Sequence, residues 1–201
     1  MSLKIKKRKN IVKDGLVLHL DAYDKESYSG SGSTWYDRSG NGFNFTMDGS
    51  GMTYNSAGYF LIQGGGATYS GSITTNTTCT LVFWIKTEDT QSLFWSAQSN
   101  LHYVGAYKDS NKEYHSNYGS PDFYMDTVEK DNIYDYLLDG EWHMVEFKNV
   151  DMSTATINYF NQYGGYTFDN DSIGAIYMYD RNLTAAESLQ NFNADRFRFG
   201  I

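Results

Sequence analysis

The stretch that most constrains the fold is TCTLVFWIKT, residues 78–87, near the middle of the chain. Two alternating rows make it up: Cys79, Leu81, Phe83 and Ile85 in one, and Thr80, Val82, Trp84 and Lys86 in the other. Successive residues of a strand point to opposite faces, so this run predicts a central strand that is covered on both sides. Cys79 is then expected to be a buried small hydrophobe and not a nucleophile, because no His–acid motif accompanies it.

Shorter runs with the same alternation predict further strands. They lie at 16–20, 58–63, 92–97, 101–107, 142–147, 156–161, 164–168 and 173–180. In the first of them, Leu16, Leu18 and Leu20 are expected to share one face. The Ser/Gly-rich residues 21–34 are expected to form a loop, and the Tyr-rich residues 103–136 an elaborated loop region.

One helix is predicted near the end of the chain. Thr184-Ala185-Ala186-Glu187 matches a capping box, and Leu189 and Phe192 follow at helical spacing, so the helix is expected over 185–193. Many short strands and one terminal helix predict an all-β fold, a two-sheet antiparallel β-sandwich with a short C-terminal helix.

Charge divides the chain into a basic arm, residues 1–13, and an acidic domain, residues 14–201. Six of the 16 basic residues lie in the arm, at Lys4, Lys6, Lys7, Arg8, Lys9 and Lys13, which leaves ten basic against 24 acidic residues in the domain. Such an arm indicates an interaction tail, and a solvated end is the alternative. A protein surface is preferred to nucleic acid as partner, because phosphates would repel the acidic domain.

No apolar run is long enough to cross a membrane, so no membrane insertion is expected. The basic start lacks the apolar stretch of a signal peptide, which predicts synthesis in the cytoplasm.

The segment 35–45, WYDRSGNGFNF, places polar residues at the offsets of a calcium loop. Its candidate ligands are Asp37, Ser39, Asn41 and Asp48. An EF-hand loop needs a bidentate Glu at the last of these positions and flanking helices, whereas this segment has Asp there and strand-like flanks. An Asx-type turn with Asn41-Gly42 at positive φ is therefore favoured; calcium stays a candidate cofactor, and no other cofactor is expected.

Several of these blocks occur together in a fixed order. They are GLVLHLDA (15–22), the W-x-D-x-SGNG stretch (35–42), TCTLVFWIKT (78–87), DGEWHMVEF (139–147) and IYMYDRNLTAAE (176–187). The ordered set resembles laminin-G-like, concanavalin A-like jelly-roll domains, and the ending 182–201 resembles such domains in bacteriophage and cyanophage virion structural proteins.

The resemblance implies a viral structural protein at the virion surface, either a capsid decoration or a fibre component, made in the host cytoplasm. Its expected partners are other virion proteins, host glycans or further copies of itself. Docking on the virion is expected through the basic arm (Lys4, Lys6, Lys7, Arg8, Lys9 and Lys13) and the tail (Arg196, Phe197, Arg198 and Phe199). Phe197 and Phe199 would add to a sheet edge.

A carbohydrate-binding module for cell-surface attachment, not necessarily bound to a virion, is the alternative function. Its candidate sugar contacts are aromatic rings interleaved with polar side chains: Tyr103, Tyr107, Asp109, Asn111, Tyr114, Asn117 and Tyr118. Packing of these tyrosines within their own loops or at a subunit interface is the favoured reading, because Tyr is abundant throughout the chain.

Catalysis is not expected and no catalytic residue is assigned; a glycoside hydrolase is kept only as a remote alternative. A glycoside hydrolase needs two carboxylates facing one sugar. The nearest match to such a pair is Glu129-Lys130-Asp131, which lies in a polar stretch and indicates a solvated charge cluster. The four histidines show no metal-binding spacing, and His143, which follows Trp142, is expected to be structural.

Overall fold

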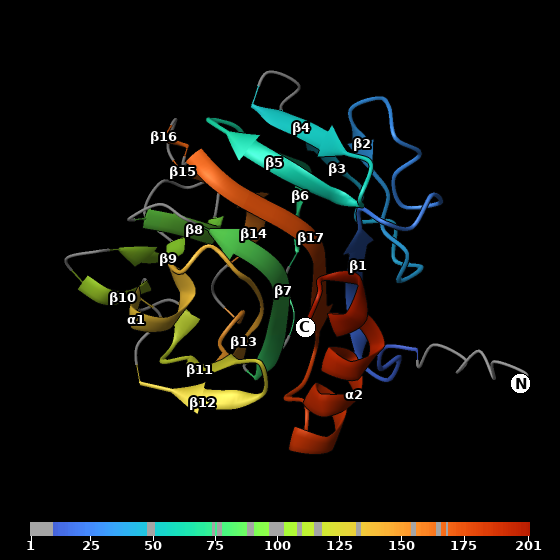
Figure 1. Ribbon diagram of the computed structural model, residues 1–201. Coiled ribbons are helices and arrows are strands. Elements are labelled where there is room, and N and C mark those ends of the chain that lie inside the picture. Colours follow the sequence, from blue (N-terminus) through green and yellow to red (C-terminus); the bar gives the residue numbers. More distant parts are fainter. Residues whose placement is uncertain are drawn as a thin grey trace, which may run out of the picture.

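The computed structural model describes residues 10–47, 51–73, 75, 78–87, 91–96, 103–107, 110–114, 118–131, 134–153, 156–163, 166–167 and 169–201. Within them the chain forms two antiparallel sheets and a helix, α2, that lies on the outer face of one sheet (Figure 1). The predicted all-β sandwich with a short C-terminal helix is confirmed. No helix in these ranges is both long enough and apolar enough to span a membrane.

The larger sheet has eight strands in the described residues, with seven in the order β12-β11-β13-β7-β17-β5-β4 and β1 paired to β17. Their bounds are β1 Leu16–Asp21, β4 Met52–Asn55, β5 Tyr59–Gln63, β7 Cys79–Thr87, β11 Asp122–Met125, β12 Val128–Lys130, β13 Trp142–Val150 and β17 Asp169–Tyr179.

The facing sheet has seven strands in the described residues, in the order β10-β9-β8-β14-β6-β3-β2. Their bounds are β2 Thr34–Trp35, β3 Phe45–Met47, β6 Ala67–Ile73, β8 Gln91–Ser96, β9 Tyr103–Tyr107, β10 Ser110–Tyr114 and β14 Ile157–Phe160. The other elements are β15 Gln162–Tyr163 paired with β16 Tyr166–Thr167, the helices α1 Tyr134–Leu137 and α2 Ala185–Asp195, and a 3-10 turn at Arg196–Arg198.

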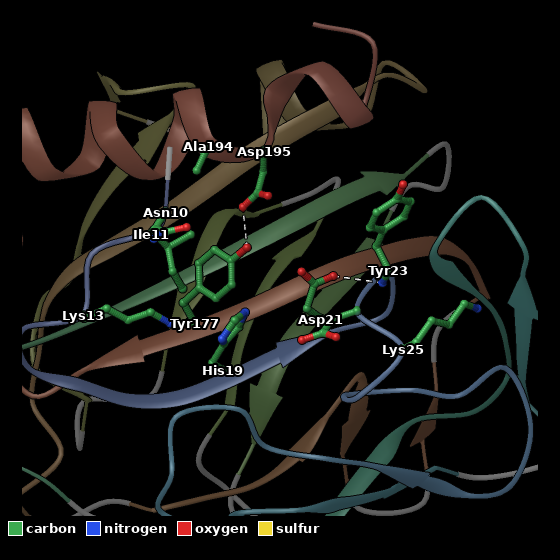
Figure 2. A pocket seen from close by; sticks show the side chains of 11 residues that line it. Asn10, Ile11, Lys13, His19, Asp21, Tyr23, Lys25, Tyr177, Ala194 and Asp195 are labelled. Atoms are coloured by element: carbon green, nitrogen blue, oxygen red, sulfur yellow. Dashed lines mark hydrogen bonds between the residues drawn. The ribbon is translucent and has the colours of Figure 1, made fainter. Parts of the chain in front are cut away.

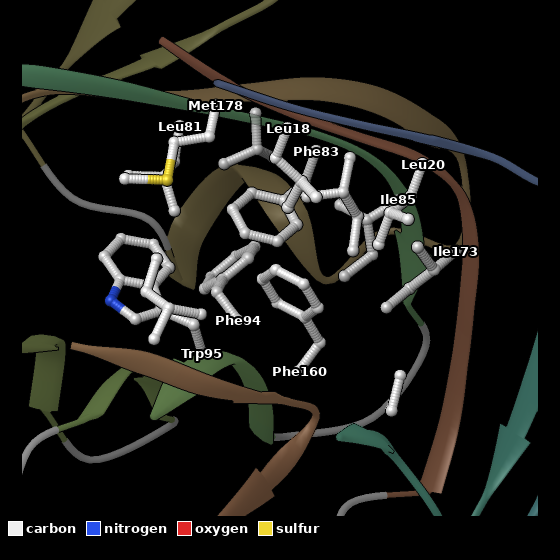
Figure 3. Close-up of a cluster of buried hydrophobic side chains, with 14 of the residues drawn as sticks. Leu18, Leu20, Leu81, Phe83, Ile85, Phe94, Trp95, Phe160, Ile173 and Met178 are labelled. Carbon is white, nitrogen blue, oxygen red and sulfur yellow. The ribbon is translucent and has the colours of Figure 1, made fainter. Parts of the chain in front are cut away.

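The central strand β7 is buried on both faces, as predicted. Phe83 belongs to the core between the two sheets. Trp84 belongs to a second cluster, the outer cluster, between the larger sheet and α2. Figure 3 shows the first core, in which Phe83 lies among side chains from both sheets. Its ring centroid is 5.3 Å from that of Phe94 and 5.9 Å from that of Phe160. Cys79 is buried, as expected for a small hydrophobe.

Strand β17 is the longest strand described, and two strands share one of its edges. β5 pairs with its first half, up to Ile173, and β1 pairs with its second half, from Ala175 onward. The β1 ladder shifts register between Leu16 and Leu18. Leu18 therefore joins Leu20 in the inter-sheet core while Leu16 packs against the outer cluster, so the prediction that all three leucines share one face is wrong for Leu16.

The capping box of α2 is confirmed, since the Thr184 side chain accepts from the Glu187 N–H and the Glu187 carboxylate accepts from the Thr184 N–H. The buried face of the helix is mostly polar, and Leu189 is 48% exposed. The reason is the sheet beneath, which presents polar groups. Ser188 Oγ donates to the buried Glu146 carboxylate at 2.8 Å, and Asn191 Nδ2 donates to the Tyr179 hydroxyl at 3.1 Å. Burial raises the pKa of Glu146.

The residues just before β1 pack along α2. The Val12 N–H donates to Asn191 Oδ1 at 2.9 Å, and both Ile11 and Val12 are buried in the outer cluster. Residues 10–13 are thus part of the folded domain, while Lys4, Lys6, Lys7, Arg8 and Lys9 lie outside the described residues.

The Tyr-rich region is more regular than the expected loop. It contains β9, which falls within the strand predicted at 101–107, and in addition β10, β11, β12 and α1. Strand β11 pairs with β13, which places Phe123 and Met125 in the core, so the loop prediction is wrong there. Only two residues of β11 face inward. An alternation of apolar and polar residues that is this short cannot be recognised within a polar stretch of sequence.

Candidate functional site

A cleft of about 430 Å³ opens between β1 and the C-terminal end of α2. Figure 2 shows β1 along one side and the helix along the other, with Tyr177 between them. Residues of 10–13, of β1 and of the loop that follows it line the cleft, together with Tyr177, Ala194 and Asp195. The antiparallel pairing of β1 with β17 sets His19 opposite Tyr177.

Two buried side chains join the floor of the cleft to the helix. The Tyr177 hydroxyl donates to Asp195 Oδ2 at 2.5 Å. Burial raises the pKa of Tyr177 well above its usual value, and the nearby Asp195 charge adds to the effect. The phenol therefore remains a hydrogen-bond donor across the physiological pH range.

An ion pair fixes the tail beside the cleft. Arg198 Nη1 lies 2.7 Å and 2.9 Å from the two carboxylate oxygens of Asp21, and each side chain is 10% exposed. Burial disfavours the Arg198 charge, but the surrounding acidic groups outweigh burial and raise the pKa of the guanidinium. Asp21 also accepts from the Tyr23 N–H at 2.9 Å, which shapes the loop after β1.

The rim combines an aromatic ring with polar groups. Tyr23 is 50% exposed, and the Arg198 guanidinium lies 5.6 Å from its ring centroid. Lys13 and Lys25 are exposed at the cleft, and His19 forms part of its wall. Burial lowers the pKa of His19, so its imidazole is neutral at pH 7, and its Nδ1 has no hydrogen-bond partner among the described residues. The cleft thus offers donors, acceptors and one aromatic face to a small polar ligand.

The turn 37–43 that was compared with a calcium loop is closed by hydrogen bonds to Asp37. Its Oδ1 accepts from the N–H groups of His19 and Ser39 at 3.0 Å and 2.8 Å. Its Oδ2 accepts from Ser39 Oγ at 2.7 Å and from the Phe43 N–H at 3.2 Å. The Asx-type turn is present, and Gly42 has the expected positive φ of 78°, whereas the expectation of a positive φ at Asn41 is wrong.

Both carboxylate oxygens of Asp37, which a cation would need as ligands, already accept hydrogen bonds from the protein. Asn41 donates through its amide Nδ2 to the Val17 carbonyl. In the ranges that the structure describes, no three His, Cys, Asp or Glu side chains are grouped to hold a metal ion. Asp48, the fourth candidate ligand, lies outside the described residues.

The predicted sugar contacts are placed only in part. Tyr118 is completely buried, its ring centroid lies 5.7 Å from that of Trp95, and its hydroxyl donates to the Thr156 carbonyl at 3.0 Å. It is a core residue, so its assignment as a ligand contact is wrong. Four of the others lie on β9 and β10, but the structure does not describe their side chains: Tyr103, Tyr107, Asn111 and Tyr114. Asp109 and Asn117 lie outside the described residues altogether.

The C-terminal tail folds back onto its own domain. The Phe199 ring stacks on Trp84 at a centroid distance of 4.5 Å and lies 4.6 Å from the ring of Trp142. It covers Gly174, where any side chain would collide with the ring. The expectation that Arg198 and Phe199 dock outward is therefore corrected, because both are held inside the domain. Phe197, by contrast, is 75% exposed.

His143 has the structural role expected from its sequence context. Its Nδ1 lies 2.6 Å from Asp126 Oδ2, and its Nε2 lies 3.2 Å from the Asp139 carboxylate. Burial opposes the imidazolium charge, but the hydrogen bonds and charges of the two carboxylates outweigh burial and raise the pKa of His143.

This shift predicts a loss of stability as the pH rises. Because the pKa of His143 is higher in the folded protein, its contribution to stability is complete below the unfolded pKa of about 6.5 and disappears as the pH passes the folded pKa. Denaturant unfolding from about pH 6 to about pH 9 should show this decline in the native protein and not in His143→Gln. Parallel curves for the two proteins would contradict the assignment.

Sequence comparison gives no family: no family model matches the chain, and neither does any curated protein. Solved structures do match the fold. A sialidase of Trypanosoma rangeli superposes with a TM-score of 0.58 at 14% identity, covering 93% of this chain and 34% of the sialidase chain. The same sialidase in complex with sialic acid gives a TM-score of 0.53 with the same coverage and identity.

A second kind of neighbour is botulinum neurotoxin type C, whose cell entry is dependent upon interaction with two ganglioside molecules. It superposes with a TM-score of 0.50 at 15% identity, covering 90% of this chain and 52% of the toxin chain. The chain thus spans about a third of the sialidase and about half of the toxin chain. These likenesses show a β-sandwich fold shared with parts of larger proteins.

Proposed function

We propose that this protein is a glycan-binding, lectin-like module whose ligand lies in the cleft between β1 and α2. The observation that carries the proposal is the exposed Tyr23 ring beside a wall of hydrogen-bonding side chains. A pyranose has an apolar face that stacks on an aromatic ring, and its hydroxyls need donors and acceptors together. His19, Lys13 and Asp24 provide both kinds of group within one cleft.

The fold neighbours support the same class of ligand. One is a sialidase crystallised with sialic acid, and another is a toxin described as interacting with gangliosides. Glu129 and Asp131, the nearest sequence match to a catalytic carboxylate pair, are both exposed and do not line the cleft. The three carboxylates that do line it, Asp21, Asp24 and Asp195, are engaged by Arg198, Arg38 and Tyr177. The proposed function is therefore binding and not hydrolysis.

The proposal predicts that Tyr23→Ala weakens glycan binding by about fivefold, because one aromatic stacking contact is worth about 1 kcal/mol. The ligand would first be found on a glycan array and its affinity then measured by calorimetry. Tyr36→Ala is the matched control, because Tyr36 is also 50% exposed and does not line the cleft. Absence of any glycan ligand for the native protein, or equal losses in the two variants, would refute this site.

A second candidate, compatible with the first, is a structural component of a virion that docks through its two ends. The observation that favours it is that Asn10 and the C-terminal tail both adjoin α2. Gln190 Nε2 donates to the Asn10 carbonyl at 2.9 Å, and the tail with its exposed Phe197 continues directly from the helix. Mass spectrometry of purified particles asks whether the chain is built into one.

A further inference from the structure

Exposed large apolar side chains gather at two separate places outside the cleft and its neighbouring loops. The tail patch consists of Leu189, Phe197 and Ile201, which are 48%, 75% and 41% exposed. The edge patch consists of Val128 on β12 and Tyr136 on α1, which are 56% and 39% exposed. Apolar surface of this kind is costly in water and commonly marks an interaction site.

The tail patch has basic surroundings. The two acidic side chains of α2 do not contribute charge to its surface, because Glu187 is paired with Arg181 at 2.7 Å and Asp195 is buried. The guanidinium of Arg196 lies 4.6 Å from the ring centroid of Phe197.

The edge patch has acidic surroundings. The hairpin formed by residues 122–131 carries four acidic residues, of which Asp126 is paired with His143, against one basic residue, Lys130. Glu129 and Asp131 are exposed, and the ammonium of Lys130 lies 4.1 Å from the ring centroid of Tyr136. Strand β12 ends the order of the larger sheet and pairs only with β11 among the described strands.

We propose that copies of this chain associate head to tail, with the tail patch of one copy on the edge patch of the next. The two patches match in chemistry, since each has an apolar centre and they carry opposite charge. They lie on different elements, β12 and α2, which Figure 1 shows at separate places on the domain. A contact between two tail patches is disfavoured, because it would bring basic surroundings together.

Such a contact does not close on itself within a dimer. Each dimer keeps one unused tail patch and one unused edge patch, so association continues into a ring or a fibre, depending on the rotation between neighbours. The inference does not rest on glycan binding at the cleft, because neither patch includes a residue that lines it.

Sedimentation velocity of the full chain at low ionic strength tests the proposal. The native protein should form species larger than dimers as its concentration rises, and these should dissociate in about 1 M salt, where charges are screened beyond about 3 Å. Phe197→Glu and Val128→Lys should each be monomeric when alone. Mixed together they should form a heterodimer and nothing larger, because each retains the one patch that the other lacks.

Tyr36→Glu is the matched control for an added surface charge and should associate like the native protein. If a primary variant is misfolded by circular dichroism, Leu189→Glu and Glu129→Lys replace it on the same patches. A native protein that stays monomeric at every concentration would overturn the proposal. So would a Val128→Lys variant that assembles normally, since that result would show tail-to-tail contact.

Discussion

Replacing Phe83 with alanine is expected to lower the free energy of unfolding by about 3–5 kcal/mol. Phe83 is completely buried on the central strand β7 and meets rings from both sheets, including that of Trp95 at 5.8 Å and that of Phe147 at 6.2 Å. Neither sheet can close over the space left by its ring without moving a neighbouring strand, so the loss includes the cavity as well as the transfer of the ring. Urea denaturation monitored by tryptophan fluorescence measures the change.

Phe197→Ala is the matched control for this experiment. The same atoms are removed from a ring that is 75% exposed, so its effect should stay within about 0.5 kcal/mol. Both variants should be compared in high salt, where self-association does not add to stability. A cost below about 1 kcal/mol for Phe83→Ala would contradict a closed core around β7.

Replacing Asp21 with alanine is expected to cost about 3–5 kcal/mol, since it leaves the Arg198 charge buried without its main partner. Arg198 has a second acidic neighbour, Asp195, but its Oδ1 is 3.8 Å away from Nε. The loss of Asp21 also removes the acceptor of the Tyr23 N–H. The variant should therefore loosen both the tail and the loop that carries the aromatic ring of the cleft.

A double-mutant cycle separates the ion pair from these side effects. Arg198→Met combined with Asp21→Leu should recover much of the loss seen in Asp21→Leu alone, because neither member of the ion pair is then left buried without its partner. The coupling energy should be about 1–3 kcal/mol in favour of the pair. Costs that simply add, measured by chemical denaturation, would contradict the view that this pair fixes the tail.

Local sequence patterns correctly predicted those helices and strands whose type and burial depend only on their own residues. TCTLVFWIKT indicated a strand covered on both faces, and the capping box at Thr184 fixed the start of α2. Leu189 was misjudged because the sheet under the helix presents the Glu146 carboxylate and the Tyr179 hydroxyl, which select polar residues for the buried face. That selection comes from β13, which is far from the helix in sequence, and from β17, which precedes the helix directly.

The cleft could not be predicted in the same way. His19 and Asp21 lie in one strand, Tyr177 lies in another, and Arg198 follows the helix, so nothing in the spacing of these residues brings them together. The pairing of β1 with β17 and the fold of the tail create the site. The segment LHLDAY carried the only local signal, an imidazole, a carboxylate and a phenol within six residues at the end of a strand.

The edge of β17 shared by β1 and β5 has a consequence for how the protein folds. β1 comes before the other described strands in sequence, yet its register partners are Ala175 to Tyr179, in the last strand described. During synthesis, β1 therefore stays without its neighbour until almost the whole chain has emerged. Contacts so distant in sequence slow the closing step of folding, and the unpaired backbone of β1 is exposed to misassembly until β17 arrives.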